Sequence, residues 1–187
     1  MTHQVYAFEP PERFVAGTVG PPGERTFFLQ ARGGGRVVSV ALEKVQVALL
    51  AEKLDELLVE ANRRFGVELP AADLSSTDNE PLDTPLDEEF RVGTLGLAFD
   101  VDTTTVVIEA IAVGEGEAEE EEEDLDDDDE DAADRDRLRV RLTPSAARAF
   151  IERARKVVAS GRPPCPLCGQ PLDASGHLCP RHNGYRR

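Results

Sequence analysis

The last quarter of this 187-residue chain holds the side chains best suited to binding a soft metal ion. It contains the only three cysteines, Cys165, Cys168 and Cys179, together with His177 and His182. The first two cysteines lie three positions apart in the sequence CPLCG, and CPRH repeats that spacing from the third cysteine to a histidine. Thiolates and imidazoles in this pattern are typical ligands of tetrahedral Zn²⁺, so the tail is predicted to be a zinc knuckle.

Two histidines compete for the fourth ligand position. His182 gives the pattern C-x2-C-x10-C-x2-H, and His177 gives C-x2-C-x8-H-x-C. Knuckle spacing favours His182. Either choice fills a tetrahedral shell, which favours a closed structural zinc over a catalytic one that needs an open position. A tail of about 25 residues is too short to build its own core, so zinc binding would supply its folding energy.

The formal net charge of −16 is distributed very unevenly. Residues 115–136 contain sixteen acids and one base, and residues 1–114 contain nineteen acids and nine bases. Residues 137–187 reverse the balance, with eleven bases and two acids. The acidic tract cannot bury apolar surface, and it is predicted to be a disordered loop. The basic C-terminal quarter is a candidate surface for binding phosphates.

Membrane insertion and secretion are not expected. No stretch approaches the roughly 18 uncharged apolar residues that a membrane helix needs. The N-terminal residues lack the basic and apolar regions of a signal peptide. Three clustered cysteines favour metal binding in a reducing compartment over a disulfide framework. The expected location is the cytoplasm.

β-Prone runs separated by turn residues predict an antiparallel sheet of about six strands. The glycines at 33–35 lack the Lys-Ser/Thr of a phosphate loop and precede a strand, which favours a hairpin turn. The extended segments are residues 4–8, 13–19, 25–31, 36–41, 88–99, 103–113 and 137–142. Residues 66–87 are polar and turn-rich, and they are predicted to form a long loop.

Two amphipathic helices are expected to cover this sheet. The first spans about residues 42–64 and has an apolar stripe that extends to Phe65. The second begins at Thr143 and Pro144, a capping residue followed by a proline suited to the first helical position, and it stops at Gly161. Four basic residues of this helix are expected outside its apolar stripe: Arg148, Arg153, Arg155 and Lys156.

These elements define an α+β domain with an insertion and an appendage. Residues 1–114 are predicted to form its main part, and residues 137–162 to supply its last strand and helix. The disordered acidic loop at 115–136 separates the two. Residues 163–187 form the zinc-knuckle tail.

Several stretches resemble the actinobacterial domain-of-unknown-function family 3090. They include VYAFEPPERFVAGTVGPPGERTFFLQA, VSVALEKVQVALLAEKLDELLVE, FRVGTLGLAFD and the end from LTPSAARAF through CPLCGQPLDASGHLCPRHNGYRR. The resemblance implies a cytoplasmic protein of unassigned function from high-GC Gram-positive bacteria, not usually described as an enzyme. It also implies that Gly-His-x-Cys is typical and that position 182 need not be histidine, which leaves His177 and His182 as equal candidates.

Three function classes compete. An enzyme is disfavoured because the serines lie in no nucleophile motif and a catalytic histidine would have to be His3 or the unused tail histidine. A non-catalytic adaptor with a structural zinc, docking on a protein partner, is favoured. The alternative is a nucleic-acid-binding protein that uses the basic quarter and is autoinhibited by the acidic tract. Its candidate phosphate contacts are Arg162, Arg181, Arg186 and Arg187.

Overall fold

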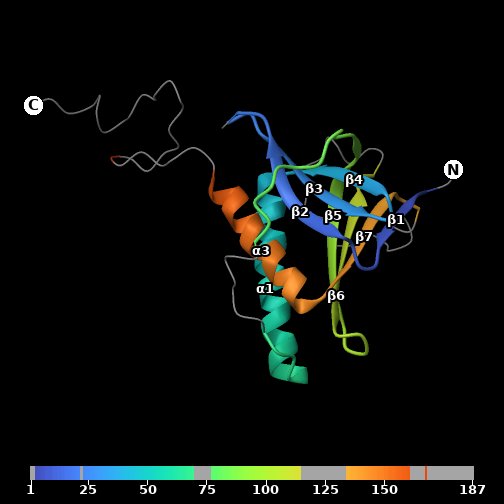
Figure 1. Ribbon diagram of the computed structural model, residues 1–187, viewed down its shortest axis with the longest axis vertical. Helices are drawn as coiled ribbons and strands as arrows, with labels where there is room; N and C mark the ends of the chain where they lie inside the picture. Colours follow the sequence, from blue (N-terminus) through green and yellow to red (C-terminus); the bar gives the residue numbers. More distant parts are fainter. Residues whose placement is uncertain (1–2, 22, 70–76, 115–133, 161–166, 168–187) are drawn as a thin grey trace, which may run out of the picture.

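A computed structural model describes residues 3–21, 23–69, 77–114, 134–160 and 167 of the chain. Within these ranges the strands and helices form an α+β fold, in which α1 and α3 lie side by side against one side of a curved sheet (Figure 1). The elements are β1 (Val5–Phe8), β2 (Arg13–Val19), β3 (Thr26–Gly33), β4 (Arg36–Leu42), α1 (Lys44–Phe65), β5 (Glu88–Asp100), β6 (Thr105–Ala112), β7 (Arg137–Leu142) and α3 (Pro144–Ala159).

The sheet is mixed and has seven strands in the order β1-β7-β6-β5-β4-β3-β2. This corrects the predicted antiparallel sheet of about six strands. β1 pairs with β7 in parallel, and β4 pairs in parallel with the start of β5. Between β4 and β5 the chain runs through α1 and a long connection, which is the kind of crossover that parallel neighbours require. Local periodicity locates strands but does not reveal which of them become neighbours.

The hairpin between β3 and β4 turns at two glycines, as the sequence predicted. Gly33 and Arg36 form the last strand pair, and Gly34 and Gly35 lie between them with φ angles of 59° and 74°. Two successive positive φ values are the requirement of the tight hairpin turn that glycine satisfies most easily.

The acidic tract separates two strands that pair directly with each other. β6 and β7 are antiparallel neighbours, in a register that runs from Val106 opposite Leu142 to Ile111 opposite Arg137. The Ala112 amide also donates to the Asp136 carbonyl at 2.8 Å. Residues 115–133 lie outside the described residues. The chain therefore leaves and re-enters the sheet at adjacent positions.

Both helices begin near the predicted residues. The Thr143 hydroxyl accepts a hydrogen bond from the Ala146 amide at 3.2 Å, and Pro144 occupies the first turn of α3. At the start of α1, the Glu43 amide donates to the Gln46 side chain at 2.7 Å. Each bond satisfies a backbone or side-chain group at a helix end, where the helix itself supplies no partner.

The core lies between the helices and the sheet. α1 buries Leu50, Leu54 and Leu58 on one stripe, and Phe150 of α3 stacks on Phe14 of β2 with 4.7 Å between ring centroids. The prediction that Phe65 belongs to the buried stripe is wrong, because this side chain is 51% exposed and stacks on Phe99 near the end of β5. No helix in the described ranges is both long and apolar enough to cross a bilayer.

The burial of the α1 stripe can be tested with two leucines of the same helix. Leu54 is fully buried, whereas Leu49 is 49% exposed. We expect Leu54→Ala to lower the free energy of unfolding by about 2–5 kcal/mol, because it removes packed methyl groups and leaves a cavity. Leu49→Ala should change it by less than about 0.5 kcal/mol. Urea denaturation measures both, and equal effects would contradict the packing described.

Candidate functional site

The residues predicted to bind zinc lie outside the described part of the chain. This applies to Cys165, Cys168, Cys179, His177 and His182. It applies equally to the four candidate phosphate-binding arginines, Arg162, Arg181, Arg186 and Arg187. Among the residues that the structure does describe, no three His, Cys, Asp or Glu side chains are grouped in a way that could hold a metal ion.

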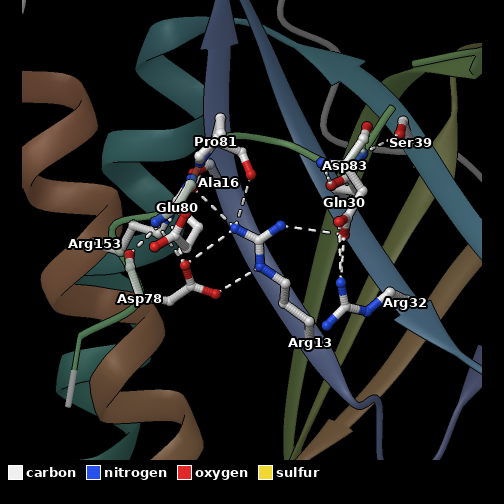
Figure 2. A network of polar contacts seen from close by, with 10 residues as sticks. All are labelled: Arg13, Ala16, Gln30, Arg32, Ser39, Asp78, Glu80, Pro81, Asp83 and Arg153. Carbon is white, nitrogen blue, oxygen red and sulfur yellow. Dashed lines mark hydrogen bonds and ion pairs between the residues drawn. The ribbon is translucent and has the colours of Figure 1, made fainter. Parts of the chain in front are cut away.

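The most extensive polar cluster of the described fold is centred on residues 77–87, which we call the strap. It passes the edge strand β2 and reaches the face of the sheet opposite the helices (Figures 1 and 2). Leu82 packs against Gly17 of β2 so closely that a Cβ on that glycine would lie 2.6 Å from the leucine side chain. Because Gly17 has no side chain, Leu82 of the strap can pack against β2 at this position.

Arg13 of β2 binds the strap at several points (Figure 2). Its guanidinium donates to both carboxylate oxygens of Asp78, at 2.6 and 3.0 Å, and to Asp83 at 3.1 Å. It also donates to the carbonyls of Glu80 and Pro81, at 2.9 and 3.0 Å. The Arg13 side chain is only 8% exposed. Bidentate pairing of this kind fixes orientation as well as charge.

Arg153 of α3 holds the strap from the other side of β2. Its Nε donates to the Ala16 carbonyl at 2.8 Å, and its Nη1 donates to the carbonyls of Asp78 and Glu80, each at 2.7 Å (Figure 2). The residue is 7% exposed, so the prediction that Arg153 lies outside the buried side of the helix is wrong. The helix passes close to an edge strand there, and the guanidinium satisfies carbonyls that no strand pairs with.

Gln30 joins the far part of the strap to the sheet. Its side chain is buried, and its amide donates to the Asp83 carbonyl at 3.0 Å while accepting from the Asp83 amide at 2.7 Å. It also donates to the Ser39 hydroxyl at 3.1 Å. Arg32 of β3 binds the Asp83 carboxylate at 3.0 Å. Asp83 is therefore held through its backbone and its side chain together.

The charges of the cluster stabilise one another. The hydrogen bonds from Arg13 hold the pKa of Asp78 below its usual range, and the hydrogen bond to Asp78 raises the pKa of Arg13. Burial lowers the pKa of Arg153, although a guanidinium still remains protonated. Two arginines thus converge on Asp78, which offsets the cost of removing charge from water.

A hollow of about 520 Å³ lies beside this cluster, between Arg13, Arg32 and the strap. The donors of Arg13 that border it are already bound to the strap, whereas the Arg32 side chain is 41% exposed. A catalytic set needs a nucleophile or base that can reach a substrate. The hydrogen bonds here instead connect α3, β2, β3 and the strap, so the cluster positions structural elements.

The arginines of the basic quarter also have acidic partners in the described fold. Arg137 and Arg139 contact Glu109, and Arg141 binds Asp100. On α3, Arg148 and Arg155 bind Asp55 of α1, and Arg153 binds Asp78. Six of the eleven bases at 137–187 therefore pair with acids from residues 1–114. Much of the sequence's charge asymmetry is neutralised within the fold.

Comparison with known proteins identifies a family. A family model described as "Protein of unknown function (DUF3090)" matches residues 6–179. The chain belongs to this family. The match spans every described helix and nearly all of β1, and it includes Cys165, Cys168, His177 and Cys179 but stops before His182. Comparisons with curated proteins and with solved structures found no match.

The role of Arg153 in this family member can be tested against its neighbour Arg155. We expect Arg153→Met to lower the free energy of unfolding by about 3–5 kcal/mol, because the Ala16 and Asp78 carbonyls lose their guanidinium donor and the Asp78 carboxylate keeps only Arg13. Arg155→Met removes a 48% exposed side chain from a surface pair and should cost less than about 1 kcal/mol. Urea denaturation followed by circular dichroism compares the two. Similar losses would show that Arg153 does not hold the strap.

The Asp78 ion pair also predicts a pH dependence. Because the folded-state pKa is lowered, the pair stabilises the fold at neutral pH. That contribution starts to fall as the pH drops below about 4, the unfolded value, and is lost as the pH falls through the lowered folded value. The difference in unfolding free energy between the unmodified protein and Asp78→Asn should therefore shrink between pH 7 and pH 3.

The matched control for this titration is Asp87→Asn, which changes an exposed aspartate of the same strap. It should alter stability by less than about 0.5 kcal/mol at pH 7. A constant difference between the unmodified protein and Asp78→Asn across the whole pH range would contradict the assigned ion pair.

Proposed function

We propose that the chain is a non-catalytic adaptor that carries a structural zinc and docks on a protein partner. The observation that supports this most directly is the set of groups to which the Arg153 guanidinium donates hydrogen bonds. The side chain of Arg153, like that of Arg13, is less than a tenth exposed, and it binds backbone carbonyls and Asp78. A buried charge committed to main-chain carbonyls stabilises the architecture of the fold.

The donor set of the tail fits Zn²⁺. Three cysteines and one histidine are a common structural ligand set, and the chain offers His177 or His182 for the fourth position. Bound zinc would cross-link the tail and supply folding energy.

Nucleic-acid binding is the second candidate. It is supported by the arginines at 162, 181, 186 and 187, in a tail with the ligands of a zinc knuckle. The ion pairs of β7 and α3 weaken it, because those arginines already face acids of the same chain. Binding would then depend on the tail, with the acidic tract as an internal competitor for the same arginines.

Metal analysis of the purified protein tests the zinc site. We expect one zinc per chain, lost in Cys168→Ser because each thiolate supplies one of four bonds. Comparing His177→Ala with His182→Ala identifies the fourth ligand, since only one of them should lower the zinc content. Full zinc occupancy in Cys168→Ser would contradict the site.

Affinity capture with quantitative mass spectrometry tests the adaptor. We expect a stoichiometric protein partner that is recovered by the zinc-loaded chain and lost with Cys168→Ser. Fluorescence anisotropy with generic DNA and RNA at several salt concentrations tests the alternative. Salt-dependent nucleic-acid affinity without a protein partner would overturn the adaptor in favour of the second candidate.

A further inference from the structure

The first two strands lie at opposite ends of the strand order, although they are neighbours in the sequence. β1 is one end of the order β1-β7-β6-β5-β4-β3-β2, and β2 is the other. Only residues 9–12 join them. A connection of that length spans at most about 18 Å. The sheet must therefore curl until its two edges come close together, and Figure 1 shows this curvature.

The gap between the two edges is closed by the clasp, our name for the contacts among Phe8 of β1, Gly33 of β3 and Arg36 of β4. Phe8 is 3% exposed and belongs to the core. A Cβ on Gly33 would lie 3.2 Å from the Phe8 ring, so the glycine leaves room for that ring. The Arg36 guanidinium lies 5.1 Å from the centre of the ring and donates to the Ala7 carbonyl at 3.2 Å. A cation over an aromatic face is attracted to it.

Among the described strands, β1 pairs with β7 only. The Gln4 carbonyl accepts a hydrogen bond from the Arg137 amide at 3.0 Å. Because backbone groups point alternately to the two sides of a strand, Tyr6 and Phe8 also direct their amides toward β7. The Ala7 carbonyl points the other way, where the clasp arginine donates to it. The backbone of β1 is therefore attached to the sheet along one side.

β7 divides its own backbone groups between two neighbours. The Asp136 carbonyl accepts from an amide of β6, so Leu138 and Val140 direct their backbone groups toward β6. Arg139 and Arg141 consequently direct their amides toward β1. A single strand thus carries two sets of amides, and only one of these sets depends on β1 for its hydrogen bonds.

β1 itself buries little of its surface. Of its four residues only Phe8 is buried, whereas Val5 and Ala7 are exposed. Tyr6 is half-buried, and its hydroxyl donates to Glu89 at 3.2 Å. The conformational entropy lost in ordering a terminal strand offsets much of what this burial gains. Segments with few buried side chains are the first parts of a fold to open.

We propose that the clasp is a conformational device that opens while the rest of the fold stays intact. Phe8 leaves its place beside Gly33 and Arg36, and β1 separates from β7 as one unit. The other six strands keep the core that they share with α1 and α3. Opening uncovers the amides of Arg139 and Arg141, so the clasp controls access to the β7 edge of the sheet.

Native-state hydrogen exchange of the zinc-loaded full chain, followed by NMR, tests the opening. The amides that depend on β1 are those of Tyr6, Phe8, Arg139 and Arg141. The reference amides, which bond toward β6, are those of Leu138 and Val140. We expect the opening constants of the β1-dependent amides to be at least about tenfold larger than those of the reference amides. Equal protection of the two sets would overturn the proposal.

The same measurement distinguishes a unit from a strand that frays at its end. Opening as a unit predicts similar opening constants at Tyr6, Phe8 and Arg141. A steady decline from Tyr6 to Phe8, with Arg141 as well protected as Val140, would show fraying and would overturn the proposal.

Leu54→Ala tests whether the rest of the fold remains packed in the open form. Leu54 is buried on α1, so the substitution destabilises the closed and the open form alike relative to the unfolded chain. Exchange of the reference amides should become at least about twentyfold faster, whereas the β1-dependent amides should change by less than about twofold. Equal acceleration of both sets would mean that β1 separates only on global unfolding, which contradicts the proposal.

Arg36→Met tests the clasp itself, because it removes the donor to Ala7 and the cation beside Phe8. We expect exchange of the β1-dependent amides to become at least about fivefold faster. Arg64→Met is the matched control, since it removes an exposed arginine that pairs with Glu60 on α1. It should change the β1-dependent amides by less than about twofold. Equal rates in Arg36→Met and the unmodified protein would show that the clasp does not hold β1.

Discussion

The pairing of Arg13 and Arg153 with Asp78 is the interaction on which the rest of the fold most depends. It joins the edge strand β2, the helix α3 and the strap at one point (Figure 2). Without it, the β2 edge would expose its carbonyls and the strap would lose its main attachment. The two guanidiniums also satisfy the carbonyls of Glu80 and Pro81, which lie in an irregular segment with no strand partner. A buried ionic group of this kind specifies position where a purely apolar contact would allow sliding.

Charge is distributed through the fold as matched pairs. The acidic first part of the chain and the basic last part meet across β6–β7 and across α1–α3, where Glu109 and Asp55 each bind two arginines. The uneven distribution of charge along the sequence therefore partly reflects which elements are neighbours in the fold. The edges of the sheet are also bonded by side chains. Arginines donate to backbone carbonyls of β1 and β2, and the Gln46 side chain of α1 donates to the Val92 carbonyl of β5.

Much of the secondary structure was predictable because its signals are local. Thr143 and Pro144 mark the start of α3, and Gly34 and Gly35 mark the β3–β4 turn. The mixed pairing was not predictable, since strand neighbours distant in sequence leave no trace in local periodicity. The buried role of Arg153 was also missed, although it lies three residues after Phe150, on the apolar side of the helix. The sequence predicted a loop there but no partners for its acids, because the two arginines that bind Asp78 lie 65 and 75 residues away along the chain. The zinc ligands remain predictions.

A double-mutant cycle on Arg13→Met and Asp78→Asn tests the central claim most directly. If the two side chains act as one unit that fixes the strap, the losses of unfolding free energy should not add. We expect a coupling energy of about 1–3 kcal/mol at neutral pH. A coupling energy near zero would show that each residue stabilises the fold independently, and it would contradict the arrangement on which the strap and the β2 edge depend.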